Sequence, residues 1–300
     1  MHPVKLPPGL MHRALAHGDA AAVAVVIAAE QLADIGEIVI EEADIVSDWQ
    51  RPSFDIGAST IGVFDGDRLV GYAEMSGGDR GDAAVDPAYR GLGIGTYLAS
   101  WMQAQARDRG LGTIGMPVPE GSPGDRLLEN LGYGVRWTSW LLALPEGQSI
   151  PDRPLPPGFT IRTATESDHR AAWIVIEDAF LEWSVRDRQS FEDFSAQVMQ
   201  RPGFEPWNLR VVTDASEQVV GAALVLIADN TGFVEKLAVR KDLRGLGLGQ
   251  ALLADAFSQA QAHGSNRSEL STDSRTGALG LYEKIGMEVT SVWVNRAIDL

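Results

Sequence analysis

Apolar positions along the chain follow two spacings, and these predict both helices and strands. Residues 20–29 form an unbroken apolar run, and residues 171–176 form a similar run in the second half, so each predicts a helix that is largely buried. Shorter apolar runs at residues 61–64 and 69–73 flank Asp65-Gly66, a dipeptide typical of a hairpin turn. Helices that alternate with strands in this way predict an α/β fold, or α+β in some classifications.

The predicted elements occur in the same order in two halves. The tetrapeptide L-P-P-G at residues 6–9 recurs at residues 155–158, and R-G-L-G-I-G at residues 90–95 recurs as R-G-L-G-L-G at residues 244–249. Prolines concentrated in residues 145–157 disfavour both a helix and a central strand there. The chain therefore predicts two duplicated domains, each a mixed central sheet flanked by helices. Their expected bounds are residues 1–144 and 159–300, with a linker at residues 145–158.

One pair of charged residues also recurs. Arg13 and Asp19 of the first half have counterparts in Arg162 and Asp168, at the same separation. Each aspartate shortly precedes an apolar helical run. Aspartate is a favoured N-cap residue because its side chain accepts a hydrogen bond from a free N–H of the first turn. The sequence thus predicts that Asp19 and Asp168 cap the two helices.

Composition excludes several classes of protein. The net charge of −16 opposes binding to nucleic acid, whose phosphates attract basic surfaces. The absence of cysteine excludes disulfides, thiolate metal sites and a cysteine acyl-enzyme, and it fits a reducing compartment, so a cytoplasmic location is expected. The apolar run at residues 20–29 is about half the length of a membrane span, so no membrane partner is expected. No metal is expected either, because five histidines lack metal-ligand spacing with a carboxylate: His2, His12, His17, His169 and His263.

The two glycine-rich hexapeptides each follow a predicted strand and precede a predicted helix. Glycines at such a turn let backbone N–H groups converge on an anion at the helix N-terminus, which favours a diphosphate ligand. Neither loop ends in the Gly-Lys-Ser/Thr of a P-loop, and neither has the spacing of the dinucleotide-binding G-x-G-x-x-G. A nucleoside triphosphatase and a dehydrogenase are therefore not predicted. A tightly packed turn without a ligand is the alternative.

Both halves resemble the GNAT superfamily of N-acetyltransferases, whose signature is Arg/Gln-x-x-Gly-x-Gly/Ala between a strand and a helix. The segment A-L-G-L-Y-E-K-I-G-M at residues 278–287 is also similar to the A-x-x-L-Y-E-K-x-G-F ending of that family. The resemblance implies that acetyl-CoA is the acyl donor and that these loops hold its diphosphate. It assigns cofactor binding to Leu237, Val239, Arg244, Gly245, Gly247 and Gly249, and to Val85, Arg90, Gly91, Gly93 and Gly95.

Within the superfamily, the tandem layout is most similar to mycothiol synthase and its two-domain relatives. The resemblance implies that the carboxyl-terminal half catalyses direct acetyl transfer, with Tyr282 as the acid that protonates the departing thiolate. Leu128 stands at the corresponding position of the first half. A leucine cannot donate a proton, so the first half is expected to be non-catalytic.

The expected general base is Glu235. An ungapped alignment with the synthase places Phe233 where its glutamate stands, and Glu235 alternates onto the same strand face. A salt bridge to Lys236 or Arg240 is the alternative role. If no carboxylate is well placed, an acceptor amine of low pKa is favoured, because deprotonating a lysine-like amine at pH 7 costs about 4.6 kcal/mol, against about 1.4 kcal/mol at pKa 8.

The acceptor pocket is implied to lie between the loop after the first helix and the final strands, which points to Glu182, Trp183 and Trp293. Aromatic walls and a carboxylate suit a cationic amine, whereas core packing is the alternative for the tryptophans. The sequence thus predicts an acetyl-CoA-dependent N-acetyltransferase that acts on a primary amine of a small molecule, as a monomer or homodimer. The alternatives are a non-catalytic acyl-CoA-binding or regulatory protein and, more narrowly, a mycothiol synthase-like enzyme for an amino-sugar conjugate.

Overall fold

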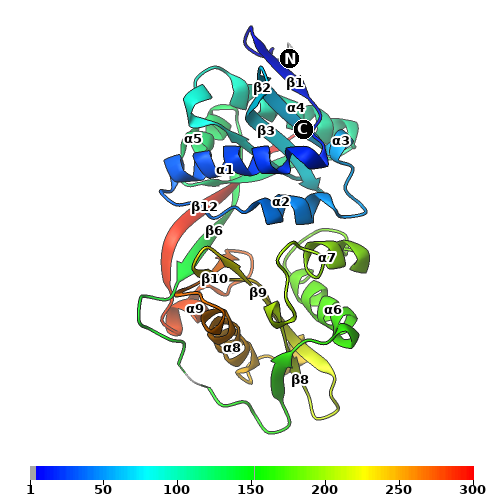
Figure 1. Cartoon of the computed structure of the whole chain (residues 1–300), viewed down its shortest axis with the longest axis vertical. Helices are drawn as coiled ribbons and strands as arrows, with labels where there is room; N and C mark the ends of the chain where they lie inside the picture. Colours follow the sequence, from blue (N-terminus) through cyan, green and yellow to red (C-terminus); the bar gives the residue numbers. More distant parts are fainter. Residues whose placement is uncertain (1–4, 152) are drawn as a thin grey trace. The chain divides into compact units, whose positions relative to one another are not determined.

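The structure is a computed structural model that describes residues 5–151 and 153–300, so His2 and Asp152 lie outside the described residues. Contacts divide the chain into two units (Figure 1). The first contains the described residues up to Thr138 together with Ser291–Leu300, and the second is Ser139–Thr290. The predicted bounds differ in that residues 139–144 belong to the second unit and Ser291–Leu300 to the first. The reason is strand pairing between segments that are distant in sequence.

The first unit is built on a sheet with the order β1-β2-β3-β4-β5-β12. Neighbouring strands are antiparallel except β4 and β5, which are parallel. The Asp65-Gly66 hairpin is confirmed between β2 and β3, with Gly66 at φ +58°. The strands are β1 (Leu10–Arg13), β2 (Thr60–Asp65), β3 (Arg68–Gly77), β4 (Arg80–Val85), β5 (Thr113–Pro119) and β12 (Glu288–Asp299).

Helices cover both faces of this sheet because successive side chains of a strand point to opposite faces. Tyr72 packs in the core under α1 (Ala20–Asp34), with α2 (Glu42–Trp49) and α3 (Ile56–Ser59) nearby. Its neighbour Ala73 packs in the opposite core, under α4 (Ile94–Asp108), and Leu128 of α5 (Pro123–Asn130) packs there as well.

The second unit repeats this plan with the strand order β6-β11-β10-β9-β8-β7. One face is covered by α6 (His169–Phe180) and α7 (Phe191–Gln197), and the other by α8 (Leu248–Ala262) and α9 (Leu279–Lys284). The strands are β6 (Gly134–Ala143), β11 (Arg267–Asp273), β10 (Thr231–Val239), β9 (Val219–Ala228), β8 (Leu209–Thr213) and β7 (Thr160–Thr163). Among the described residues, no helix is long and apolar enough to span a membrane.

The recurring arginine–aspartate pair is an ion pair in both units, and its aspartates stand at the N-caps of α1 and α6 without a side-chain capping bond. The Asp19 side chain makes no capping bond to α1; it accepts from the Ala16 N–H at 2.9 Å and from Arg13 at 2.8 Å. Asp168 accepts from the backbone N–H of Thr165 and from Arg162 in the same way, and this guanidinium holds the pKa of Asp168 well below its usual range. The predicted N-cap position is confirmed for Asp19 and Asp168, but the expected capping bond from the side chain is not made, because the carboxylates close the 3-10 turns that precede the helices.

Candidate functional site

The glycine loops adopt backbone conformations that require glycine. In the second unit, Gly245 (φ +79°) and Gly247 (φ +88°) are left-handed, and α8 begins directly after them. Gly91 and Gly93 repeat this before α4 in the first unit. The first N–H groups of a helix have no acceptor within it, so both loops present free donors and the positive end of a helix dipole. Each loop can therefore receive an anion.

For the third glycine of each loop, the relevant feature is the space that a side chain would occupy. A Cβ on Gly95 would lie 2.6 Å from the Leu127 side chain, so this glycine lets α4 pack closely against α5. A Cβ on Gly249 would make only an ordinary contact, at 3.7 Å, with the Val239 side chain. Val239 itself, and Leu237, pack against the core under α8.

Both motif arginines are held by carboxylates. Arg90 donates to Asp34 at 2.7 and 2.8 Å and lies 3.5 Å from Glu30. Arg244 donates to Glu182 at 2.7 and 3.0 Å. The structure thus joins Glu182, which was expected to bind the amine, to the arginine that was expected to bind the diphosphate.

An arginine that the sequence analysis did not single out lies at the second glycine loop. A Cβ on Gly247 would overlap the guanidinium of Arg153, with 2.8 Å to Cζ, whereas a Cβ on Gly93 would meet nothing within 4 Å. Gln250 holds this part of the chain by donating to the Pro151 carbonyl at 3.0 Å. Arg153 is exposed and makes no ion pair within the described ranges. It brings an uncompensated positive charge to the candidate anion site.

Tyr282 lies on α9, half-buried, and packs against the core cluster under α8. Burial raises the pKa of its phenol to about 12. The side chain therefore stays protonated throughout the physiological range. Leu128, its counterpart, is 3% exposed in the core of the first unit.

Glu235 occupies an irregular point of β10. Val234 pairs with Val225 and Lys236 pairs with Leu224, so Glu235 is the extra residue of a β-bulge. The expectation that Glu235 alternates regularly with Phe233 is therefore wrong. Its carboxylate, 37% exposed, accepts from the Lys236 ammonium at 2.7 Å, which is the alternative role that the sequence left open.

The two tryptophans expected at one acceptor pocket belong to different units. Trp183 lies in the second unit beside Phe180, with the Arg275 guanidinium 4.8 Å from its ring. Trp293 lies in the first unit, because β12 pairs with β5 and sets Trp293 opposite Pro119. The assignment of Trp293 to a pocket of the second half is therefore corrected.

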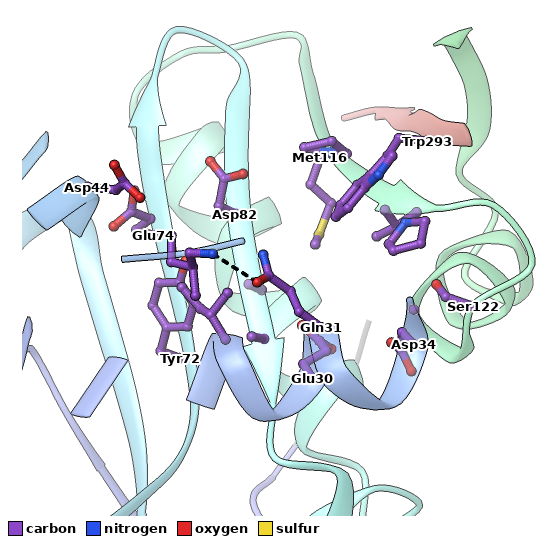
Figure 2. Close-up of a pocket in the computed structure, with 18 of the residues that line it drawn as sticks. Glu30, Gln31, Asp34, Asp44, Tyr72, Glu74, Asp82, Met116, Ser122 and Trp293 are labelled. Carbon is purple, nitrogen blue, oxygen red and sulfur yellow. Dashed lines mark hydrogen bonds between the residues drawn. The ribbon is translucent and has the colours of Figure 1, made fainter. Parts of the chain in front are cut away.

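Trp293 lines a cavity of about 310 Å³ in the first unit (Figure 2). The cavity lies on the side of the sheet that α1 and α2 cover, and β3, β4 and β5 contribute to its wall. In the view of Figure 2, Asp44 and Glu74 lie at one end and Met116 and Trp293 at the other. Its acidic lining residues are Glu30, Asp34, Asp44, Asp48, Glu74 and Asp82.

Two of these carboxyl groups have strongly raised pKa values. Burial raises the pKa of Glu74 to about 7, and the nearby charge of Asp82 acts in the same direction. Burial also raises the pKa of Glu30 to about 7, although Arg90 opposes the shift. Within the described residues, no three His, Asp or Glu side chains are grouped as metal ligands would be.

The sequence analysis missed this cavity, although one signal was present. Glu74 directly follows the apolar strand run at residues 69–73, and an acidic residue in a buried strand needs a partner or a function. Arg153 gave no such signal, since an arginine in a proline-rich segment is ordinarily a solvated side chain.

Comparison with known proteins supports the interpretation of the loops. The acetyltransferase (GNAT) family matches residues 30–133 and 169–287. A mycothiol acetyltransferase from Salinispora arenicola is 29% identical over 254 residues, which cover 79% of this chain and 80% of that protein. A mycothiol acetyltransferase from Thermobispora bispora is 27% identical over 284 residues, which cover 90% and 92%.

Solved structures agree over nearly the whole chain. A GCN5-related N-acetyltransferase from Sphaerobacter thermophilus has a TM-score of 0.74 and 28% identity, covering 98% of this chain and 97% of that one. A tandem GNAT protein from the clavulanic acid biosynthesis pathway, with a TM-score of 0.72, 17% identity and coverage of 97% and 98%, shares the fold. The resemblance predicted from the sequence is confirmed: the chain belongs to the acetyltransferase (GNAT) family, carries two such domains in tandem, and is an acyltransferase.

Proposed function

We propose that the protein transfers an acetyl group from acetyl-CoA to a primary amine of a small molecule, and that the second unit performs the transfer. The observation that carries the proposal is a contrast between the units. Both present the anion-binding glycine loop, but only the second has a phenol, Tyr282, where the first has the buried Leu128. A proton donor is what the departure of a thiolate requires.

The loop of the second unit fits the diphosphate of an acyl-CoA. Gly245 and Gly247 leave the N-terminal donors of α8 uncovered, and Arg153 supplies a positive charge beside Gly247. A charge-assisted hydrogen bond to a phosphate oxygen is stronger than a neutral one, so Arg153 strengthens the site. Acetyl-CoA, when bound, supplies the thioester whose carbonyl carbon the amine attacks.

The strands beside the loop offer a donor for the oxyanion. β10 pairs with β11 only from Thr231 to Val234, and the bulge at Glu235 follows directly. Beyond that point, the β10 backbone is released from this ladder. Its amides are suited to stabilise negative charge on the thioester oxygen, as preorganised donors do in acyl transfer.

Tyr282 gives its proton to sulfur as the carbon–sulfur bond breaks, and the proton that the attacking nitrogen loses restores the phenol from the phenolate. The phenol pKa of about 12 exceeds that of an ordinary thiol, about 8.5, so complete transfer costs about 5 kcal/mol. The proton therefore moves with bond cleavage rather than before it. The expected base, Glu235, is bound to Lys236, which favours an acceptor amine of low pKa.

Because the chain has no cysteine, the thiol of released CoA can be measured with a thiol reagent without background from the protein. We would incubate the protein with acetyl-CoA and a panel containing an amino sugar, an α-amino acid amide and Nα-blocked lysine. Thiol release together with an acetylated product in mass spectra supports the proposal, and the amino sugar and α-amine are expected to exceed lysine at pH 7. Acetyl-CoA binding without thiol release for any amine would indicate a non-catalytic acyl-CoA-binding protein.

The similarity to mycothiol acetyltransferases favours one narrower class of acceptor. Mycothiol acetyltransferases align with 79% to 90% of this chain. We therefore include an amino-sugar conjugate in the panel. Product formation with the conjugate, but not with the free amino sugar, would support this narrower assignment.

A further inference from the structure

The proline-rich segment between the two halves packs on the second unit, although the sequence predicts a linker there. We call residues 145–151 and 153–158 the strap. The strap lies between β6 and β7 in the chain, and in Figure 1 it runs along the side of the unit that carries α8 and α9. All of its residues belong to the second unit. A segment that only tethers two domains has no need of such packing.

Apolar contacts and one hydrogen bond fix the strap to the second unit. Ile150 is 7% exposed and packs in the core cluster under α8, and Leu155 packs against the same cluster. Gln250, in the first turn of α8, donates from Nε2 to the Pro151 carbonyl at 3.0 Å. Burial of Ile150 stabilises this position because it removes apolar surface from water. The strap is therefore anchored beside the N-terminus of α8.

The prolines limit how far Arg153 can move from this anchor. A proline fixes its own φ at about −65°, and the residue before a proline is restricted to extended backbone. Pro151 follows Ile150, and Pro154 follows Arg153. Since the strap has few backbone conformations to choose from, it loses less entropy when it is held in one place. The anchoring of Ile150 therefore restricts the position of Arg153.

The anchored strap sets Arg153 on the glycine loop of the second unit. A Cβ on Gly247 would lie 2.7 Å from Cδ and 2.8 Å from Cζ of Arg153, so this side chain lies directly on the backbone of the glycine. In the first unit, a Cβ on Gly91 or Gly93 would meet no atom of the described residues within 4 Å. The second loop thus has a basic side chain in place before any ligand arrives.

We propose that the strap is a built-in part of the cofactor site of the second unit, and that Ile150 is the positioning residue that holds Arg153 against the diphosphate. This inference rests on the proposed function, which places the diphosphate of an acyl-CoA at that loop. An arginine that is already in position makes its charge-assisted hydrogen bond without the entropy cost of ordering a free side chain. Ile150 therefore increases cofactor affinity without contacting the cofactor.

A double-mutant cycle tests the proposal. Calorimetry without an amine gives the acetyl-CoA dissociation constants of the full-length wild type, Ile150→Ala, Arg153→Ala and the double variant. Because Ile150 acts through Arg153, Ile150→Ala is expected to weaken binding about fivefold when Arg153 is present and less than about twofold when residue 153 is alanine. Equal losses in the two backgrounds, or no loss from Ile150→Ala, would overturn the proposal.

Two further variants separate positioning from a general loss of stability. Val212→Ala removes buried methyl groups from the same core cluster, but on β8, and is expected to bind acetyl-CoA as the wild type does. A loss as large as that of Ile150→Ala would contradict the proposal. Ile150→Val removes a single methyl group, so it should give the same pattern with a smaller loss if Ile150→Ala does not fold.

Failure of this inference and failure of the proposed function give different results. If the wild type binds acetyl-CoA and the losses from Ile150→Ala are equal in the two backgrounds, the strap does not position Arg153, whereas the proposed function stands. If the wild type does not bind acetyl-CoA, both are wrong.

Discussion

Arg244 donates two hydrogen bonds to the carboxylate of Glu182, at 3.0 and 2.7 Å, and so ties the second glycine loop to the segment that follows α6. Arg90 makes the corresponding contact with Asp34, the last residue of α1. In both units, therefore, the motif arginine fixes the loop to the end of the first long helix. We infer that the free loop donors and Arg153 make the first contacts with a diphosphate in the second unit.

Glu182→Gln is expected to tighten acetyl-CoA binding several-fold. The substitution removes a negative charge next to Arg244 and frees its guanidinium for a phosphate. The loss of stability should stay below about 1 kcal/mol, because the ion pair is well exposed. Calorimetry with acetyl-CoA measures the affinity, and Glu217→Gln in the β8–β9 turn is the control for net charge. Weaker binding by Glu182→Gln would show that the pair itself supports the site.

Arg153→Ala is expected to weaken acetyl-CoA binding about tenfold, which is the usual scale for one hydrogen bond to a charged group. Arg240→Ala is the matched control, because Arg240 is also near the loop in sequence but is paired with Asp242. Calorimetric dissociation constants for the two variants give the comparison. An unchanged constant for Arg153→Ala would remove Arg153 from the cofactor site.

Stability is expected to fall as pH rises through 7, in contrast to the usual behaviour of ion-paired carboxylates. The pKa of Glu74 is about 7 in the folded protein and near 4.5 when unfolded, so the folded state binds the extra proton between these values. The proton on Glu74 contributes on the order of 3 kcal/mol to the free energy of unfolding. This contribution is complete below pH 4.5 and is lost above pH 7. Glu30 acts with the same sign.

Thermal unfolding at pH 5 and pH 8 checks this. Glu74→Gln should unfold at a higher temperature than the wild type at pH 8 and show a smaller difference between the two pH values. Glu42→Gln, which removes an exposed carboxylate of α2, should retain the wild-type difference. Other charged groups lie around Glu74, on β4, on α2 and just after α2, and the comparison with Glu42→Gln controls for them: Arg80, Asp82, Asp44, Asp48 and Arg51. Identical profiles for Glu74→Gln and the wild type would refute the assignment.

Most elements of the fold could be predicted because the same sequence patterns occur in both halves of the chain. The glycine loops have the same left-handed geometry in both units, and the apolar runs at residues 20–29 and 171–176 lie within α1 and α6. The partners of the last strands could not be predicted. Trp293 pairs with Pro119, about 170 residues earlier, and local patterns carry no information about such distant pairing.

The candidate site was predicted only where local sequence determines it. The loop glycines follow from the backbone conformation that they must adopt. The bulge at Glu235 is a single extra residue, and the pattern of apolar and polar residues in the sequence does not reveal it. The contacts of Arg153 with Gly247 and of Arg244 with Glu182 join distant segments, and only the folded chain shows them.

The central claim is that Tyr282 is the acid of an acetyl transfer in the second unit, and Tyr282→Phe tests it most directly. The variant keeps the ring that packs against the core and removes only the hydroxyl. Its kcat should be measured with the best acceptor of the amine panel, and its acetyl-CoA dissociation constant by calorimetry. The account predicts that kcat falls by about 10² to 10⁴ while the dissociation constant stays within twofold. A kcat close to that of the wild type would contradict it.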